Sequence, residues 1–147
     1  MIWLGIAAAV FTIDFCIKKW AEKNLKGKTR KQIGKTGFSL KLVHNKGFAG
    51  SKMDHNPALV KTVHAIVLFF FGFLCIVMGC FKKGNELQAF GLALVLGGGA
   101  SNLYDRIKQD YVTDYLGLPV AKKLVFNISD LCMFAGTLMA IIGELKK

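Results

Sequence analysis

The sequence predicts an all-α integral membrane protein, with four transmembrane helices and a small β-sheet in the connecting loops, folded as one domain over residues 1–147. Hydrophobic residues make up 53% of the chain and the mean hydropathy is +0.42, which is too apolar for a disordered chain. These residues are also gathered into long runs, which is typical of bilayer-spanning helices rather than of an ordinary soluble domain.

The four predicted spans are the apolar stretches 1–17, 62–81, 87–104 and 124–143. The second is the clearest, because its 20 residues include no Asp, Glu, Lys or Arg. At a rise of about 1.5 Å per residue it reaches about 30 Å, the thickness of the hydrocarbon layer. The third is weaker, since the three glycines at 97–99 interrupt its periodicity. We expect helices in all four, because lipid offers no partner for unpaired backbone groups.

The loops are predicted to lie on both sides of the membrane. Four spans place both termini and a short turn on one side, and the loops 18–61 and 105–123 on the other. Residues 39–45, SLKLVHN, alternate between apolar and polar, which is the pattern of a strand. A small sheet on the membrane surface is therefore expected in the first loop.

The net charge of +11, from 20 Lys and Arg against 9 Asp and Glu, indicates a negatively charged partner. Such a balance also suits a nucleic-acid-binding protein. Here the basic residues lie between apolar runs, which favours anionic phospholipid headgroups as partners and argues against nucleic acid. The loop 18–61 holds 12 Lys and Arg, so the positive-inside rule places this loop in the cytoplasm.

Two carboxylates lie within predicted spans, where an unpaired charge is costly. Asp14 precedes Lys18 by one helical turn, so the two side chains can form an ion pair that anchors the helix end. Asp130 follows Asn127 by three residues, a spacing that fits a helix cap as well as a chemical role. Asp114 lies in a predicted loop and, taken alone, is an ordinary loop acid.

The segment GGGASNLYDR, residues 97–106, combines small and polar residues near the end of the third span. Small residues allow helices to approach closely in a bilayer. Asn102, Asp105 and Arg106 place an amide, an acid and a guanidinium within about one turn. A phosphate-binding loop is disfavoured, because no Gly-Lys-Ser/Thr follows. We therefore expect a hydrogen-bonded network that positions other groups.

Metal-dependent and serine hydrolases find no support in the sequence. The four cysteines, at 16, 75, 80 and 132, form no Cys-x-x-Cys pair, so neither a zinc site nor a disulfide framework is expected. The chain contains no Gly-x-Ser-x-Gly and no His-Glu-x-x-His motif, which are the signatures of serine and zinc hydrolases.

Five short motifs follow one another along nearly the whole chain. They are Asp14 with Lys18, Asn45-Lys46-Gly47-Phe48-Ala49, Gly98 with Asn102-Leu103-Tyr104-Asp105-Arg106, Val112-Thr113-Asp114-Tyr115, and Phe126-Asn127-Ile128-Ser129-Asp130. Each motif alone carries little information, but their order across four spans is specific. Together they resemble lipoprotein signal peptidase, also called signal peptidase II, the intramembrane aspartic protease of bacteria.

The resemblance implies that Asp114 and Asp130 form the catalytic dyad of an aspartic endopeptidase. Its substrate is then a prolipoprotein that carries an S-diacylglyceryl group on its lipobox cysteine, and the cut falls just before that cysteine. No metal and no organic cofactor are implied, and a monomer suffices, since one chain supplies both acids. The residues implied to line or support the active site are Asn45, Gly47, Asn102, Asp105, Arg106, Asn127, Asp14 and Lys18.

The chemistry of two neighbouring carboxyls agrees with this implied role. Two carboxylates in one site cannot both ionise cheaply, so one is driven toward its protonated form. The ionised partner can take a proton from water while the other protonates or hydrogen-bonds the scissile carbonyl. The apparent pKa values belong to the pair, and the sequence leaves open which acid is the base.

The resemblance also implies a location, the bacterial cytoplasmic (inner) membrane, with both termini in the cytoplasm and the active site at the outer face. This orientation conflicts with the positive-inside expectation for the loop 18–61, and we take the order of the motifs as the stronger indication. The 12 basic residues of this loop then lie outside, where they can contact anionic lipid or the polar edge of the substrate.

Several positions depart from the usual family pattern and predict a divergent member, in which the departures bear on substrate preference more than on chemistry. Ser101 replaces a usual Gly, Ser129 a usual Ala and Leu131 a usual Ser. Asp110 stands where Gly is common and adds a like charge near Asp114. The alternative function is a catalytically silent paralogue that binds lipidated peptides, although retention of both acids argues against it.

Overall fold

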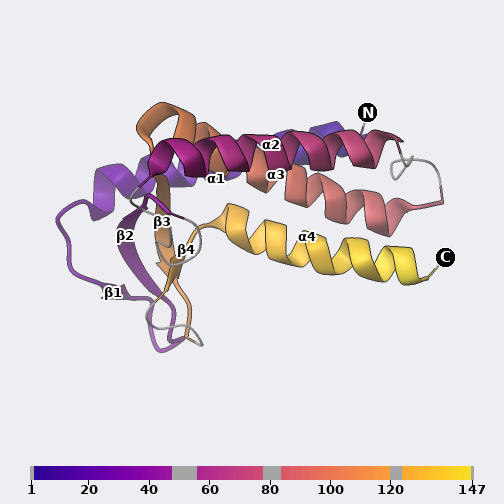
Figure 1. The fold of residues 1–147 in the computed structure, drawn as a ribbon. Helices are drawn as coiled ribbons and strands as arrows, with labels where there is room; N and C mark the ends of the chain where they lie inside the picture. The colour runs from indigo at the N-terminus through magenta and orange to yellow at the C-terminus, as the bar shows by residue number, and fades with distance from the viewer. Residues whose placement is uncertain (1, 48–55, 78–83, 120–123, 147) are drawn as a thin grey trace.

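The computed structural model describes residues 2–47, 56–77, 84–119 and 124–146, which form four helices and a four-stranded sheet (Figure 1). The helices run side by side, the sheet lies at one end of them, and both chain ends lie at the opposite end. The elements in chain order are α1 (Ile2–Leu25), β1 (Lys31–Gln32), β2 (Ser39–Asn45), α2 (Pro57–Val77), α3 (Glu86–Gln109), β3 (Val112–Gly117), β4 (Val125–Phe126) and α4 (Ile128–Leu145). The predicted combination of helices with a small sheet is confirmed.

The helices bury polar side chains and expose large apolar ones, the reverse of a soluble bundle. Phe69 of α2 is 78% exposed and Phe134 of α4 is 69% exposed, whereas Asp14 of α1 is fully buried. Exposure of many large apolar side chains is unfavourable in water and suits helix surfaces that face lipid.

Helix α3 continues without a break through the glycines at 97–99, so the interruption suggested by the sequence is absent. Each glycine faces a different helix. A Cβ atom built on them in turn would lie 2.5 Å from the backbone oxygen of Ala7 in α1, 2.7 Å from that of Ser129 in α4, and 2.7 Å from the side chain of Leu68 in α2. Because these positions carry no side chain, α3 packs closely against all three other helices.

Length and hydropathy support some of the predicted spans more strongly than others. Among the described residues, α4 alone is both long and apolar enough to cross a membrane, and α2 contains a shorter apolar stretch, Pro57–Phe73. Helices α1 and α3 have 24 residues each, and both contain buried polar groups. The arrangement of four spans therefore stays a prediction.

The sheet has the strand order β1-β2-β3-β4, and all neighbouring strands are antiparallel. Strand β2 covers residues 39–45, which confirms the strand predicted there. In the pairing of β2 with β3, Val43 lies opposite Asp114 and Asn45 lies opposite Val112. Tyr115 of β3 packs on Ala21 of α1, so the sheet brings Asp114 to the ends of the helices.

Candidate active site

Asp130 is placed by the cap at the start of α4. The N-cap residue is Asn127, whose Oδ1 accepts a hydrogen bond from the backbone N–H of Asp130 at 2.8 Å. In return, Asp130 Oδ2 accepts a bond from the backbone N–H of Asn127 at 3.2 Å. This reciprocal capping box fixes the carboxylate in the first turn of the helix. The capping role that the sequence allowed for this pair is confirmed.

Asn127 also connects Asp130 to Asp114. The Nδ2 group of Asn127 donates to Asp114 Oδ1 at 2.8 Å, and the Nδ2 group of Asn45, at the end of β2, donates to Asp114 Oδ2 at 3.2 Å. Asp114 is 2% exposed, so it is a buried strand residue rather than a loop acid. The structure therefore brings the two predicted dyad acids to the two sides of one asparagine.

The surroundings of Asp114 favour its protonated form. Burial and, after it, the negative charge of Asp130 raise the pKa of Asp114 to about 7, although the hydrogen bonds from Asn45 and Asn127 act in the opposite direction. A carboxyl group with a pKa near neutrality can hold or release a proton at physiological pH. The site can therefore hold one proton on its pair of acids near pH 7.

Asn102 of α3 connects Asp130 to a buried cation. Its Nδ2 group donates to Asp130 Oδ1 at 2.8 Å. Its Oδ1 atom accepts from Lys18 Nζ at 2.8 Å and from Asn127 Nδ2 at 3.1 Å. Lys18 is only 3% exposed, so the cation acts on this site without competition from bulk water.

Lys18 is held between two carboxylates. Its Nζ atom lies 2.8 Å from Asp14 Oδ2 and 3.1 Å from Asp105 Oδ2, which confirms the ion pair predicted for Asp14 and Lys18. Asp14 Oδ2 also accepts hydrogen bonds from the hydroxyls of Ser101 at 2.7 Å and Ser129 at 2.6 Å. A buried carboxylate is tolerated when it is paired and hydrogen-bonded in this way.

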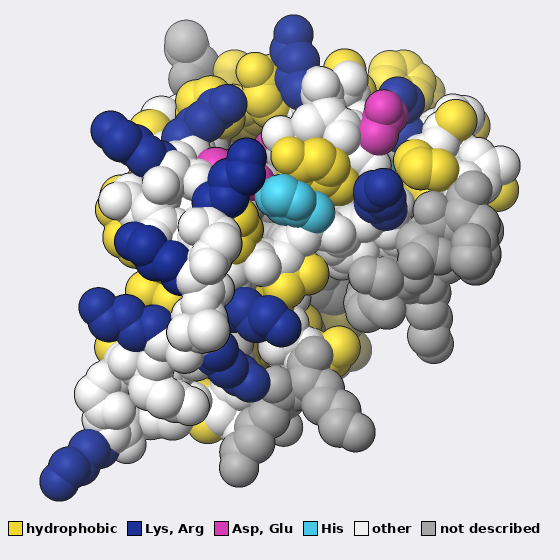
Figure 2. All heavy atoms as spheres, turned by 90° about the vertical axis from the view of Figure 1, so that its left-hand side faces the viewer, with side chains coloured by type: hydrophobic (Ala, Val, Ile, Leu, Met, Phe, Trp, Pro, Cys, Tyr) yellow, Lys and Arg dark blue, Asp and Glu magenta, His cyan; other side chains and the backbone are white. Residues whose placement is uncertain are grey.

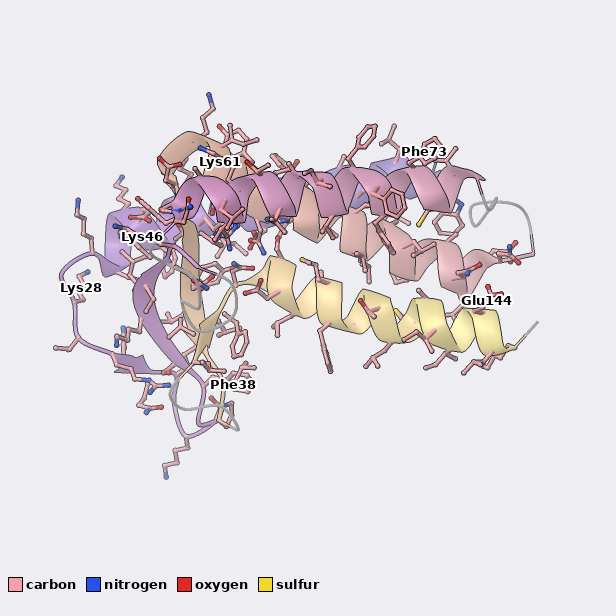
Figure 3. All side chains as sticks on the ribbon, viewed as in Figure 1. Lys28, Phe38, Lys46, Lys61, Phe73 and Glu144 are labelled. Carbon is pink, nitrogen blue, oxygen red and sulfur yellow. The ribbon has the colours of Figure 1, made fainter. Side chains whose placement is uncertain are left out.

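Asp105 and Arg106 join the end of α3 to the sheet. Asp105 Oδ2 accepts from the backbone N–H of Thr113 at 3.1 Å. Arg106 Nη2 donates to the carbonyl of Gly47 at 2.7 Å and Nη1 to that of Lys46 at 3.4 Å. Lys46 lies at the sheet end of the molecule, far from Glu144 at the other end of α4 (Figure 3). Arg106 therefore holds the backbone that follows β2.

The ten predicted site residues lie together at the sheet end of the helices. Arg106 contacts Gly47. The other eight are joined by hydrogen bonds or ion pairs into one network: Asp14, Lys18, Asn45, Asn102, Asp105, Asp114, Asn127 and Asp130. Asp110 lies elsewhere, because its exposed carboxylate pairs with Lys61 at 2.8 Å. The prediction that Asp110 acts on the dyad as a neighbouring like charge is wrong.

Three members of the network were missed as functional residues. Ser101 and Ser129 stood out only as departures from the family pattern, yet both donate to Asp14. The hydroxyl of Tyr115 donates to Asp14 Oδ1 at 3.2 Å and accepts from the backbone N–H of Ile128 at 3.1 Å. The sequence feature that could have revealed these three residues is Asp14, because a buried carboxylate needs several hydrogen-bond donors.

The carboxylate oxygens of Asp114 and Asp130 accept hydrogen bonds from protein groups. Within the described ranges, no group of three or more His, Cys, Asp or Glu side chains could hold a metal ion. Asp114 and Asp130 accept from amide and backbone N–H groups instead. This arrangement suits the transfer of protons between two carboxyls and a substrate.

A cavity of about 420 Å³ lies between α2, α3 and α4. Its walls are mostly apolar and include Leu68, Leu92 and Met133. Met133 follows Asp130 by three residues in α4, so the cavity begins about one helical turn from that carboxylate. A cavity with such walls suits an apolar chain.

Comparison with known proteins identifies the family. The family described as signal peptidase (SPase) II matches residues 6–146. The chain belongs to the signal peptidase II family. It is 31% identical over 147 residues to the lipoprotein signal peptidase of Caldicellulosiruptor bescii, covering all of this chain and 93% of that protein. It is 30% identical to that of Clostridium acetobutylicum, covering 93% of this chain and 89% of that protein.

The fold is shared with a solved bacterial membrane enzyme. That structure, obtained by the in meso method, matches with a TM-score of 0.83 at 20% identity and covers 98% of this chain and 87% of its own. Membership of the signal peptidase II family makes the protein a peptidase, and the likeness to the solved structure shows that the two share a fold.

Proposed function

We propose that the protein is an aspartic endopeptidase that removes the signal peptide from diacylglyceryl-modified prolipoproteins, cutting just before the lipidated cysteine. The relatives named lipoprotein signal peptidase support this class of substrate. The observation that carries the aspartic mechanism is the position of Asn127, which hydrogen-bonds to Asp114 and Asp130 together. In this mechanism one carboxyl takes a proton from water and the other hydrogen-bonds the scissile carbonyl.

The cavity between α2, α3 and α4 supports a lipidated substrate. It begins about one turn from Asp130 and is bounded largely by apolar side chains. An acyl chain of the substrate, or an apolar residue of its signal peptide, loses contact with water there. The scissile bond then lies next to the acids, while its apolar neighbours stay within the bilayer.

We propose that the helices span the cytoplasmic (inner) membrane of a bacterium, with both termini inside and the dyad at the outer face. Both chain ends lie at the end of the helices remote from the sheet, and the dyad lies where the sheet meets them (Figure 1). The exposed apolar side chains of α2 and α4 support burial of these helices in lipid. One chain supplies both acids, so a monomer is sufficient, and we expect no nucleic acid as a partner.

The sheet end of the molecule supports contact with anionic phospholipids. Figure 2 shows Lys and Arg side chains spread over this end, with few Asp or Glu among them. The exposed basic residues between positions 19 and 46 are Lys19, Lys23, Lys26, Lys28, Arg30, Lys31, Lys35, Lys41 and Lys46. Each basic residue near an anionic membrane surface contributes about 1 kcal/mol of attraction.

This role of the basic residues is tested by replacing Lys31, Lys35 and Lys41 with Gln. We expect unchanged membrane insertion and weaker binding to vesicles that contain anionic lipid. Accessibility labelling of the termini reports the topology of the same variant. An inverted topology would show that the lysines set the orientation instead of contacting lipid.

A gel-shift cleavage assay tests the enzymatic function. Purified protein in detergent or lipid is given a diacylglyceryl-modified prolipoprotein, alongside the Asp114→Asn and Asp130→Asn variants. We expect cleavage by the wild type only. Cleavage that survives either substitution overturns the dyad assignment. Failure of the wild type on several lipobox sequences, beside an active control peptidase, would favour the silent paralogue that only binds lipidated peptides.

A further inference from the structure

The two dyad acids receive hydrogen bonds from asparagines that differ in their freedom to turn. Asn102 donates its Nδ2 to Asp130, and its Oδ1 is occupied by Lys18 and Asn127. Exchanging the amide N and O by a half turn would set an NH₂ group against the Lys18 ammonium, which has only donors to offer. Asn102 is therefore fixed as a donor toward Asp130.

The second oxygen of Asp130 also faces a donor that cannot change its role. Asp130 Oδ2 accepts from the backbone N–H of Asn127, which the capping box holds in place. Each oxygen of Asp130 therefore faces a donor that cannot become an acceptor. A proton placed on Asp130 would find no hydrogen-bond acceptor among these contacts. These two hydrogen bonds therefore favour the ionised form.

Asn45 differs from Asn102 on this point. Its Nδ2 group lies 3.2 Å from Asp114 Oδ2, while its Oδ1 atom is buried with no hydrogen-bond partner among the described residues. A half turn of this amide brings Oδ1 toward Asp114, where it can accept the O–H of a protonated carboxyl. The turn gives the buried Oδ1 a partner and moves the NH₂ group to the position that Oδ1 leaves, so Asn45 can face Asp114 with either a donor or an acceptor.

We propose that this asymmetry assigns the catalytic roles, with Asp130 as the base and Asp114 as the acid that holds the shared proton. The inference rests on the proposed function and extends it. Lys18, acting through Asn102, and Asn45 are positioning residues. Among the described residues, the charged and titratable groups that act on the pair or on its neighbours are Asp14 and Lys18 from α1, Asp105 and Arg106 from α3, and Tyr115 from β3. The raised pKa of Asp114 agrees with this assignment.

The proton transfers then follow a definite order. Asp130 takes a proton from water as the water oxygen bonds to the scissile carbonyl carbon, and Asp114 gives its proton to the carbonyl oxygen. When the carbon–nitrogen bond breaks, the proton on Asp130 passes to the leaving amine. Asp114 recovers its proton from the hydroxyl that becomes the new carbonyl oxygen, so one water is consumed and both acids are restored.

The pH profile of kcat/KM tests the assignment in Asn102→Ala and Asn45→Ala. Loss of the fixed donor at Asn102 should move the acidic limb to higher pH by about one unit, with the alkaline limb unchanged. Loss of the acceptor at Asn45 should move the alkaline limb to lower pH and leave the acidic limb unchanged. Thr12→Ala is the matched control, because its exposed hydroxyl bonds to the backbone of its own helix at Ala8.

Each alternative outcome contradicts the assignment. Crossed effects, with Asn102→Ala moving the alkaline limb or Asn45→Ala moving the acidic limb, would exchange the two roles. A shift of the alkaline limb to higher pH in Asn45→Ala would show that Asn45 stays a donor. Asn102→Ser and Asn45→Ser are the milder second pair if the alanine variants melt below the assay temperature.

A measurement without substrate separates this inference from the proposed function. The infrared band of protonated carboxyl groups is titrated in the folded protein. Its midpoint near neutral pH should be lost in Asp114→Asn, should move in Asn45→Ala and should not move in Asn102→Ala. This result stands whether or not a prolipoprotein is cleaved, whereas a wild type with this titration and no cleavage contradicts only the proposed function.

Discussion

Substitution of Gly98 by alanine should separate α3 from α4 at the site. A Cβ atom at this position would lie 2.7 Å from the backbone oxygen of Ser129 and 2.9 Å from Cγ of Met133. Ordinary contact at about 3.5 Å requires a shift of about 0.8 Å. Asn102 lies one turn further along α3, and its bond to Asp130, now 2.8 Å, would stretch to about 3.6 Å, beyond hydrogen-bonding range.

The expected result is a loss of stability and of activity. Overpacking of this kind costs about 2 kcal/mol, and a displacement near 1 Å at a reacting group lowers the rate by up to about a hundredfold. Thermal melting in detergent and the gel-shift cleavage assay measure the two effects. Gly5→Ala is the control, since a Cβ at Gly5 of α1 meets nothing within 4 Å. If Gly98→Ala matches Gly5→Ala in melting temperature and cleavage rate, the close contact of α3 with α4 does not position Asn102 against Asp130.

Three further predictions concern charge and hydrogen bonding. Because the pKa of Asp114 is about 7 in the folded protein and about 3.9 when unfolded, its contribution to stability is fully present below about pH 3.9 and is lost as the pH rises through about 7. Asp114→Asn should therefore gain melting temperature relative to the wild type between about pH 4 and pH 8, and a constant difference would contradict the raised pKa. Ser129→Ala removes the 2.6 Å bond to Asp14 and should lower stability by about 2 kcal/mol, measured by denaturant unfolding beside Thr12→Ala; equal losses in both variants would count against the network. Asp110→Asn breaks only an exposed ion pair with Lys61, so the free energy of unfolding should change by less than about 1 kcal/mol and the cleavage rate should stay within about twofold; a larger fall in rate would place Asp110 in the site.

Local patterns in the sequence identified the parts of the molecule that depend on neighbours in the chain. The alternation in residues 39–45 predicted β2, and the one-turn spacing of Asp14 and Lys18 predicted their ion pair. The same reasoning misjudged the glycines at 97–99, because helix propensity counts each glycine as a defect. In this protein the defect is outweighed by close packing of α3 against three other helices.

Sequence patterns did not predict contacts between residues that lie far apart in the chain. The role of Asp14 as an acceptor for Ser101 and Ser129 joins α1, α3 and α4, and no spacing within one helix reveals such a contact. Asp110 was misplaced for the opposite reason. Its sequence separation from Asp114 suggested proximity, but the chain turns at Asp110, which has a left-handed backbone (φ 59°), and its side chain is exposed beside Lys61.

The sequence by itself determined which residue types were available and which segments are apolar, because periodicity and hydropathy are local properties of the chain. It also supplied, through the order of five motifs, the membership of a peptidase family. Only the tertiary structure decided which amide faces which carboxylate. The direction of an amide depends on all of its partners at once, and the partners of Asn102 come from α1, α4 and the residue that caps α4.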